Sequence, residues 1–116
     1  MTALPHFTAH NGFALPALGL GTYALNGDAG ADAVASAIGA GYRLIDSAFN
    51  YENEGSVGRG VRASDVDASE LIVTTKLPGR HHPRAKARTS IEESRSRLGV
   101  DAIDLHLIHC CLLYTS

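Results

Sequence analysis

Three short apolar runs in this sequence each end on a side chain that carries or transfers protons, and this feature constrains the fold most. The runs span 42–46, 71–76 and 104–109, and their last residues are Asp46, Lys76 and His109. Short apolar runs bounded by turn signals are typical of buried strands. Segments with helical spacing separate the runs, and strands that alternate with helices predict an α/β fold built on a parallel sheet.

A fourth apolar run and a hairpin motif precede these strands. Successive runs start at 17, 42, 71 and 104, which matches βα units of about 30 residues each. Upstream, residues 6–16 alternate apolar and polar side chains around Asn11-Gly12. Asn-Gly suits a two-residue turn in which both central residues have positive φ, so a β-hairpin with such a turn is expected.

Helices are predicted between the runs from residue spacing. The first is expected to begin near Ala31, and the third at Pro83, with Gly99 as its C-terminal cap. Residues three, four or seven apart share one side of a helix and are expected to face the sheet. They are Val34, Ala37, Ile38 and Gly41 in the first helix, Val57 and Val61 in the second, and Ala87, Ile91, Ser94 and Leu98 in the third.

Four βα units are compatible with two architectures. One is a small doubly wound sheet, and the other is half of an eight-stranded barrel, which normally needs about 250 residues. The length of 116 residues favours the first. The strand ends favour the second, because in a barrel the carboxyl ends of all strands converge on one mouth, where active sites lie.

Asp46, Lys76 and His109, together with Tyr51 in the loop after Asp46, are expected to form a proton-transfer site. A tyrosine hydroxyl has an ordinary pKa of about 10, and a lysine cation nearby favours its ionised form. An aspartate would hold the lysine in place, and a histidine within reach would orient a carbonyl oxygen. Each residue alone has an ordinary structural explanation, so the prediction depends on their convergence. A hydride donor would then have to come from a cofactor.

The residues around this site resemble the aldo-keto reductase family. Residues 41–58, GYRLIDSAFNYENEGSVG, are similar to its first signature, and residues 98–109, LGVDAIDLHLIH, are similar to a later one. The segment ELIVTTKL around Lys76 fits as well. The bacterial 2,5-diketo-D-gluconate reductase-like group is the most similar. The resemblance covers residues 6–109 and implies the N-terminal half of a (β/α)8 TIM barrel, with about four βα units preceded by a β-hairpin.

The resemblance also implies an activity. It implies an oxidoreductase that reduces aldehydes or ketones to alcohols with hydride from NADPH, with NADH as the alternative cofactor. Tyr51 is the general acid in this scheme, and the implied catalytic residues are Asp46, Tyr51, Lys76 and His109. The implied cofactor-binding residues are Gly21, Thr22, Tyr23 and Asp46. No metal is expected, because the histidines do not pair at helical spacing beside a carboxylate.

The resemblance ends after His109. The family has Trp-Pro at this point, whereas this chain reads CCLLYTS. Residues 1–109 are therefore expected to be a truncated aldo-keto reductase domain, and residues 110–116 a non-native C-terminal tail. A half-barrel has two open sheet edges. The 116-residue chain is thus expected to be inactive by itself and to self-associate through these edges.

Composition limits the partners and the location. A net charge of −2 and a pI near 6.3 give no electrostatic footprint for nucleic acid or an anionic membrane surface. No apolar run approaches the roughly 18 residues of a membrane span, and the N-terminus does not resemble a secretory signal. Cys110 and Cys111 are adjacent, which favours a reducing cytoplasm. The expected partner is a small carbonyl substrate.

Two alternatives stay open. Gly19, Gly21 and Ala24 match the G-x-G-x-x-A fingerprint of a Rossmann dinucleotide-binding domain, with Asp46 about 20 residues further on. Against it, residues 25–30 resemble a loop where that fold needs a helix, and the other strand-end residues have no role in it. The second alternative is a non-catalytic half-barrel that serves binding or assembly, because a fold does not fix a function.

Overall fold

The computed structural model describes residues 5–109 of the chain. Within these residues a hairpin of β1 (His6–Thr8) and β2 (Ala14–Pro16) precedes a sheet of β3 (Leu20–Gly21), β4 (Leu44–Asp46), β5 (Ile72–Pro78) and β6 (Leu105–His109). The helices between the sheet strands are α1 (Gly27–Gly39), α2 (Glu54–Ala63) and α3 (Arg84–Leu98). Short 3-10 turns, η1 (Phe49–Tyr51), η2 (Ala68–Glu70) and η3 (Gly79–His81), lie in the connections.

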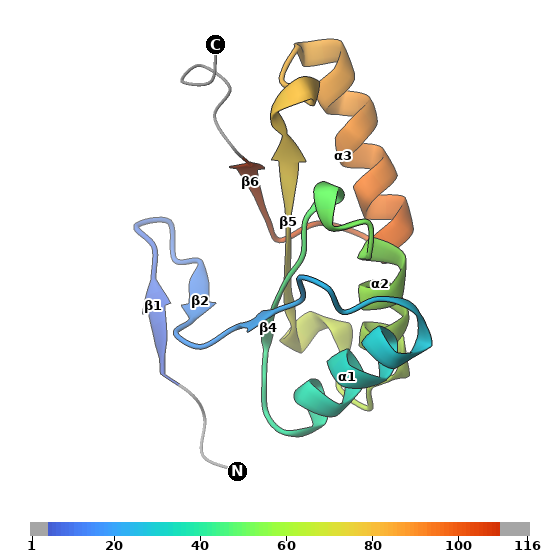
Figure 1. Ribbon diagram of the computed structural model, residues 1–116. Coiled ribbons are helices and arrows are strands. Elements are labelled where there is room, and N and C mark those ends of the chain that lie inside the picture. The colour runs from blue at the N-terminus through green and yellow to red at the C-terminus, as the bar shows by residue number, and fades with distance from the viewer. Residues whose placement is uncertain (1–4, 110–116) are drawn as a thin grey trace.

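The sheet strands run parallel and lie side by side in their order along the chain, β3-β4-β5-β6. All of the helices in the described part of the chain cover the same face of this sheet (Figure 1). A doubly wound sheet has helices on both faces, and a Rossmann sheet reverses its strand order in the middle. The predicted α/β class is therefore confirmed, and both doubly wound alternatives are excluded.

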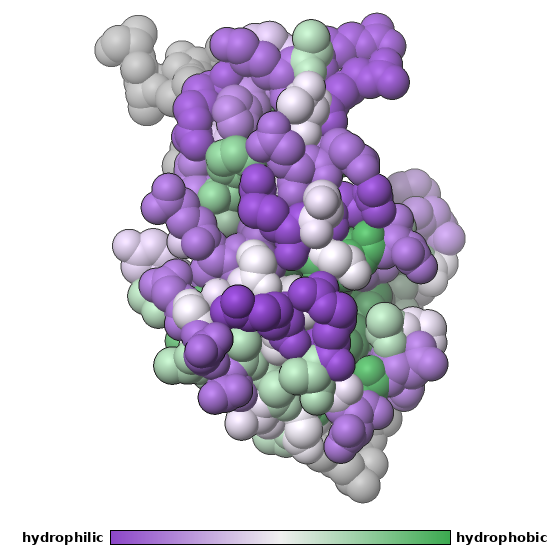
Figure 2. Space-filling view, turned by 90° about the vertical axis from the view of Figure 1, so that its right-hand side faces the viewer, coloured by the Kyte–Doolittle hydropathy of each residue, from purple (hydrophilic) through white to green (hydrophobic). Residues whose placement is uncertain are grey.

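The core lies between the sheet and the helices. It joins buried apolar side chains of α1, α2 and α3 to residues of β4 and β5 and to Leu71, which directly precedes β5. The core residues are Val34, Ile38, Ile45, Val57, Val61, Leu71, Val73 and Leu98. Branched and other apolar residues at these positions are what the predicted helix faces require. The outer surface of the helices is mainly hydrophilic (Figure 2). The helices thus have one apolar face each, which is buried against the sheet.

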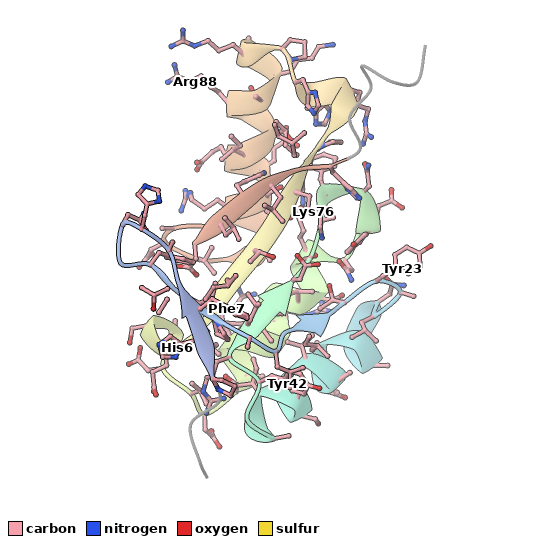
Figure 3. The ribbon with its side chains drawn as sticks, turned by 90° about the vertical axis from the view of Figure 1, so that its left-hand side faces the viewer. His6, Phe7, Tyr23, Tyr42, Lys76 and Arg88 are labelled. Atoms are coloured by element: carbon pink, nitrogen blue, oxygen red, sulfur yellow. The ribbon has the colours of Figure 1, made fainter. Side chains whose placement is uncertain are left out.

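The other face of the sheet has no helix on it in the described part of the chain. The hairpin lies on this side (Figures 1 and 3). Leu107 of β6, which pairs with Lys76, is 42% exposed, and Phe7 of the hairpin is 69% exposed. Strands β3 and β6 each have a partner on one side only among the described residues. Within residues 5–109, apolar side chains on this face and backbone groups along these two edges are left uncovered.

The hairpin is confirmed, but its predicted two-residue turn is wrong. Strand β1 pairs with β2 in the register Phe7 with Leu15, and the Ala9 N–H donates to the Phe13 carbonyl at 2.8 Å. Three residues, 10–12, therefore form the loop. Of these only Gly12 has a positive φ, at 89°, while the Asn11 side chain accepts from the Phe13 N–H at 3.0 Å. This is the three-residue loop with glycine at its left-handed position.

Two details of the predicted helices also differ. Helix α1 begins at Gly27, earlier than the expected Ala31, because the Gly30 N–H already donates to the Asn26 carbonyl at 2.8 Å. In α3, Ile91 is 38% exposed and Ser90 is buried in its place. The contacting face of α3 runs through Ser90, Ser94 and Leu98, so Ile91 lies at its border.

Helix α2 packs closely against α3 at Gly58. An added Cβ there would overlap the carbonyl group of Leu98, whereas at Gly55 it would meet nothing within 4 Å. We expect Gly58→Ala to lower the free energy of unfolding by about 1–3 kcal/mol through overpacking. Gly55→Ala is the matched control in the same helix and should raise it by about 0.5–1 kcal/mol. Urea unfolding followed by circular dichroism measures both; equal effects would mean that the helices are not in contact at Gly58.

Candidate active site

Strands β4 and β5 bring two of the predicted site residues into direct contact. Asp46 is the last residue of β4, and Lys76 lies near the end of β5. The Lys76 ammonium donates to the Asp46 carboxylate, with 2.7 Å between Nζ and Oδ2. Figure 3 shows Lys76 on the sheet face opposite the helices. The parallel pairing of the two strands places both side chains on this face, as the convergence of strand ends predicts.

Tyr51 completes a chain of hydrogen bonds. It ends the turn η1 that follows β4, and Lys76 Nζ donates to its hydroxyl oxygen at 3.2 Å. Lys76 also donates to the Ser47 carbonyl at 2.9 Å. An ammonium group has three N–H donors, so all of them have acceptors in this arrangement. The side chain is 15% exposed. Lys76 is therefore held as a fixed cation between a carboxylate and a phenol.

His109 lies next to the Tyr51 ring. It is the last residue of β6, and its ring stands at 90° to that of Tyr51, with 5.9 Å between the centroids. Its Nδ1 atom is buried and has no hydrogen-bond partner among the residues that the structure describes. All four predicted residues, Asp46, Tyr51, Lys76 and His109, are therefore brought together at one end of the sheet.

The loop after β3 borders the same place. Gly21 pairs with Asp46 across the two strands, and the backbone N–H and hydroxyl of Thr22 both donate to the Asp46 carbonyl, at 3.1 and 2.8 Å. Tyr23 is 76% exposed, and its ring meets that of Tyr51 edge to face at 5.3 Å. A Cβ at Gly21 would meet nothing within 4 Å. Open space at Gly21 and an exposed aromatic ring fit a planar cofactor ring beside Tyr51.

Two residues that support the site were not predicted. Thr74 donates to Asp46 Oδ1 at 2.5 Å, so both carboxylate oxygens have a donor. Asn53 is 2% exposed, and its amide donates to the carbonyls of Thr22 and Leu25 and accepts from the Ser47 hydroxyl. An asparagine just before a helix usually indicates an N-cap. Asn53 instead ties the loop after β3 to the end of β4.

Backbone strain marks both loops of the site. Ala24, next to Tyr23, has a φ of 66°, and Glu52, next to Tyr51, has a φ of 56°. Residues other than glycine rarely adopt this left-handed conformation, and they persist where the surroundings force it, often at functional sites. Both strained residues directly follow a tyrosine whose ring faces the site. The loops are therefore held in specific conformations at this end of the sheet.

His106 lies behind the site on β6. It pairs with Thr75, and neither ring nitrogen has a hydrogen-bond partner among residues 5–109. Burial lowers the pKa of His106 from its ordinary value of 6.5, and the negative charge of Glu54 opposes this shift in part. The folded state therefore favours the neutral imidazole, whereas the unfolded chain takes up the proton more readily.

The free energy of unfolding is expected to be highest above pH 6.5 and to decrease as the pH falls below this value. The reason is that His106 takes up a proton more readily in the unfolded chain than in the folded one. His106→Gln cannot titrate and should flatten this dependence. Urea unfolding at several pH values between about 7 and about 5 measures it. His10→Gln, at an exposed histidine of the hairpin loop, is the control. Equal slopes in the His106 variant and the wild type would contradict the expectation.

Groups of metal-binding side chains and membrane-spanning helices are both absent from residues 5–109. No group of three or more His, Cys, Asp or Glu side chains in this range is arranged to hold a metal ion. In the same range, no helix has the length and apolar character needed to cross a membrane. The predicted tail, residues 110–116, lies outside the described residues, as do Cys110 and Cys111.

The chain is similar to known reductases over most of its length. The model of the aldo/keto reductase family matches residues 17–116. A Corynebacterium protein named 2,5-diketo-D-gluconic acid reductase B is 55% identical over 109 residues, which are 94% of this chain and 39% of that protein. Morphine 6-dehydrogenase of Pseudomonas putida is 48% identical over 90% of this chain and 36% of its own length.

Solved structures agree with this similarity. An aldo/keto reductase from Brucella melitensis superposes with a TM-score of 0.88 at 34% identity, over 92% of this chain and 42% of that one. The aldo-keto reductase of Bombyx mori in complex with NADP gives a TM-score of 0.85 at 37% identity, over 94% of this chain and 39% of that one. The chain spans about two fifths of these proteins. Its four-stranded sheet corresponds to the N-terminal half of their (β/α)8 barrel, which confirms the predicted architecture.

Proposed function

The chain belongs to the aldo/keto reductase family, and we propose that it supplies the proton-transfer half of the active site of a nicotinamide-dependent carbonyl reductase. The hydrogen-bond chain from Asp46 through Lys76 to Tyr51, with distances of 2.7 and 3.2 Å, carries this proposal. A phenol fixed against an ammonium group is suited to give up its proton, because the cation stabilises the phenolate that remains.

In the proposed reaction Tyr51 acts as the general acid. Its hydroxyl donates a proton to the carbonyl oxygen of an aldehyde or ketone as that oxygen gains negative charge. Lys76 stabilises the phenolate, and Asp46 holds Lys76 at the correct place and balances its charge. His109, beside the Tyr51 ring, orients the carbonyl oxygen through a ring nitrogen. The product is the alcohol.

The proposed cofactor is NADPH, with NADH as the alternative. When bound, a reduced nicotinamide supplies the hydride for the carbonyl carbon. Gly21, Thr22 and Tyr23 would hold its ring, and the free lone pairs of the Asp46 carboxylate would accept hydrogen bonds from a ribose hydroxyl. The NADP complex of the Bombyx mori relative supports the phosphorylated form. The open space at Gly21 supports the placement of the ring.

The proposed substrates are small carbonyl compounds, in agreement with the name of the Corynebacterium relative, 2,5-diketo-D-gluconic acid reductase B. We propose no nucleic-acid or membrane partner and a cytoplasmic location. In this proposal residues 1–109 form the reductase portion and residues 110–116 are foreign to it. The non-catalytic half-barrel is the alternative, and it predicts no turnover even when a full barrel is present.

A complete barrel is needed to test the proposal. We define the completed barrel as residues 1–109 of this chain continued by the C-terminal remainder of the Corynebacterium reductase. With an aldehyde or diketo sugar acid, it should consume NADPH and form the alcohol. A completed barrel that binds NADPH but does not turn over the substrate would favour the non-catalytic alternative. The remainder of the Corynebacterium protein without residues 1–109 is the control, because it lacks the proposed acid.

The 116-residue chain by itself is expected to be oligomeric and inactive. Leu107 and Ile108 of β6 are 42% and 71% exposed. Among the described residues β6 pairs with β5 on one side only, so the backbone groups on its outer side are free to pair with a second chain. Sedimentation velocity should show mainly dimers or larger species. Leu107→Lys should shift the distribution toward monomer, because a charge on an edge strand opposes pairing. A monomer at all concentrations would contradict self-association.

A further inference from the structure

A buried carboxylate lies behind the active site, on the helix side of the sheet. Glu54 is the first residue of α2 and is 1% exposed. Both of its carboxylate oxygens are used: Oε2 accepts from the Thr75 hydroxyl at 2.5 Å, and Oε1 accepts from Nε and Nη2 of Arg97 at 3.0 and 2.9 Å. A buried charge of this kind has to be paired and hydrogen-bonded. Glu54 thus joins α2, β5 and α3 at one point.

The partners of Glu54 each lead to a site residue. Thr75 directly precedes Lys76 on β5. The Arg97 guanidinium lies over the ring of Phe49, 4.5 Å from its centroid, and Phe49 begins the turn η1 that ends at Tyr51. The same carboxylate is therefore connected to Lys76 on one side and to Tyr51 on the other.

The turn η1 is also held from its other side. Arg80 of η3 lies over the Phe49 ring at 5.5 Å, and its Nη1 donates to the Asn50 side chain at 2.8 Å. The ring of His81 meets Phe49 edge to face at 4.9 Å. The basic segment after β5 thus packs against the turn that precedes α2. Each residue of η1 has an anchor, and for Tyr51 that anchor is Lys76.

We propose that Glu54, Arg97, Arg80 and Phe49 form a positioning device, here named the η1 clamp, that fixes the Tyr51 hydroxyl against Lys76. This inference rests on the proposed function. The clamp acts through its neighbours: Glu54 and Arg97 bind each other on the helix side of the sheet, and Arg80 and Phe49 lie in the connections after β5 and β4. Its role depends on the planar guanidinium of Arg97, which forms two hydrogen bonds with one carboxylate oxygen of Glu54 and also stacks on the Phe49 ring.

Arginine is required in this arrangement by geometry as well as by charge. A lysine at 97 keeps the positive charge, but its ammonium is a point donor without a plane to stack on Phe49. Leucine at 49 keeps apolar volume but removes the ring that both guanidinium groups contact. These two substitutions therefore loosen the clamp without creating a buried uncompensated charge. They separate positioning from simple stability.

The test compares Phe49→Leu, Arg97→Lys and the ring-preserving Phe49→Tyr in the completed barrel. Misplacement of a reacting group by about 1 Å costs about 100-fold in rate, so we expect kcat to fall by about 10- to 100-fold in the first two. The dissociation constant of NADPH should stay within about twofold, and Phe49→Tyr should recover most of kcat. Arg95→Lys is the matched control, because Arg95 lies on the same helix and pairs with exposed Glu92.

Crystal structures of the same variants give a readout that does not need turnover. In Phe49→Leu the Tyr51 hydroxyl should lie beyond hydrogen-bond distance of Lys76 Nζ. An unmoved hydroxyl overturns the clamp whether or not the wild type is active. Unchanged kcat in both Phe49→Leu and Arg97→Lys overturns it as well. If the wild-type completed barrel is inactive but the Tyr51 hydroxyl moves in Phe49→Leu, the proposed function is overturned and the clamp is supported.

Discussion

Tyr51→Phe in the completed barrel is expected to lower kcat for carbonyl reduction by about 10²- to 10⁴-fold, the usual contribution of a general acid. The substitution removes only the hydroxyl, which is the group that meets Lys76 Nζ at 3.2 Å. The ring contacts with Tyr23 and His109 stay available, so the shape of the pocket should be kept. NADPH should therefore bind with nearly the same affinity while the chemical step fails.

Initial rates of NADPH consumption and a fluorescence titration of NADPH binding measure the two halves of this prediction. Tyr42→Phe is the matched control: Tyr42 packs against the core away from the site, and removal of its hydroxyl should leave kcat nearly unchanged. Turnover of Tyr51→Phe at the wild-type rate would disprove the role of Tyr51 as the acid. A loss of NADPH binding in step with kcat would point to a collapsed pocket.

Arg97→Ala is expected to lower the free energy of unfolding of the completed barrel by about 3–5 kcal/mol, because it leaves the buried Glu54 carboxylate without its cation. Glu54 is 1% exposed with Arg97 in place, and the Thr75 hydroxyl is the donor that would remain on its carboxylate. Replacement of both partners by leucine should recover much of this loss, since a buried apolar pair needs no charge compensation. Arg97→Leu and Glu54→Leu, each made alone, complete a double-mutant cycle with this double variant.

Urea unfolding of these variants tests the expectation, with Glu92→Ala as the control in the same helix. The Glu92–Arg95 pair is solvent-exposed, and such pairs contribute at most about 1 kcal/mol. If Arg97→Ala costs no more than this control, the Glu54 carboxylate does not depend on Arg97. The buried pair is supported if Arg97→Ala loses more stability than Glu92→Ala and if the double-leucine variant is more stable than Arg97→Ala.

The strand-end residues were predictable because they follow from topology. Once parallel strands are assigned, their last residues have to meet at one edge, and the positions of Asp46, Lys76 and His109 can be inferred without coordinates. The hairpin was predictable for a similar reason, since alternation fixes which residues face each other. Its loop was not, because Asn-Gly is compatible with both a two-residue and a three-residue connection and only the register distinguishes them.

Residues whose contacts cross distant elements could not be predicted. Arg97 lies in a strongly polar helix and looks like a solvated side chain, while its partner Glu54 is 43 positions away. Asn53 has the local signal of an N-cap, but its side chain bonds to carbonyls about 30 positions upstream, of which Thr22 is one. Spacing assigned Ile91 to the buried face of α3, but Ser90 is buried there and Ile91 is 38% exposed. The local spacing of residues along the chain does not indicate which residues 31 to 43 positions apart come into contact.

The order of the strands has a consequence for how the chain is made. Strands β4, β5 and β6 each pair with the strand one βα unit before them, so these pairings within the described residues need no partner that is synthesised later. Contacts that close short loops form faster than those that close long ones, and domains fold from the N-terminus as they leave the ribosome. The sheet can therefore grow strand by strand during translation, and the clamp on η1 can close only when Arg97, the last of its residues to be synthesised, has emerged.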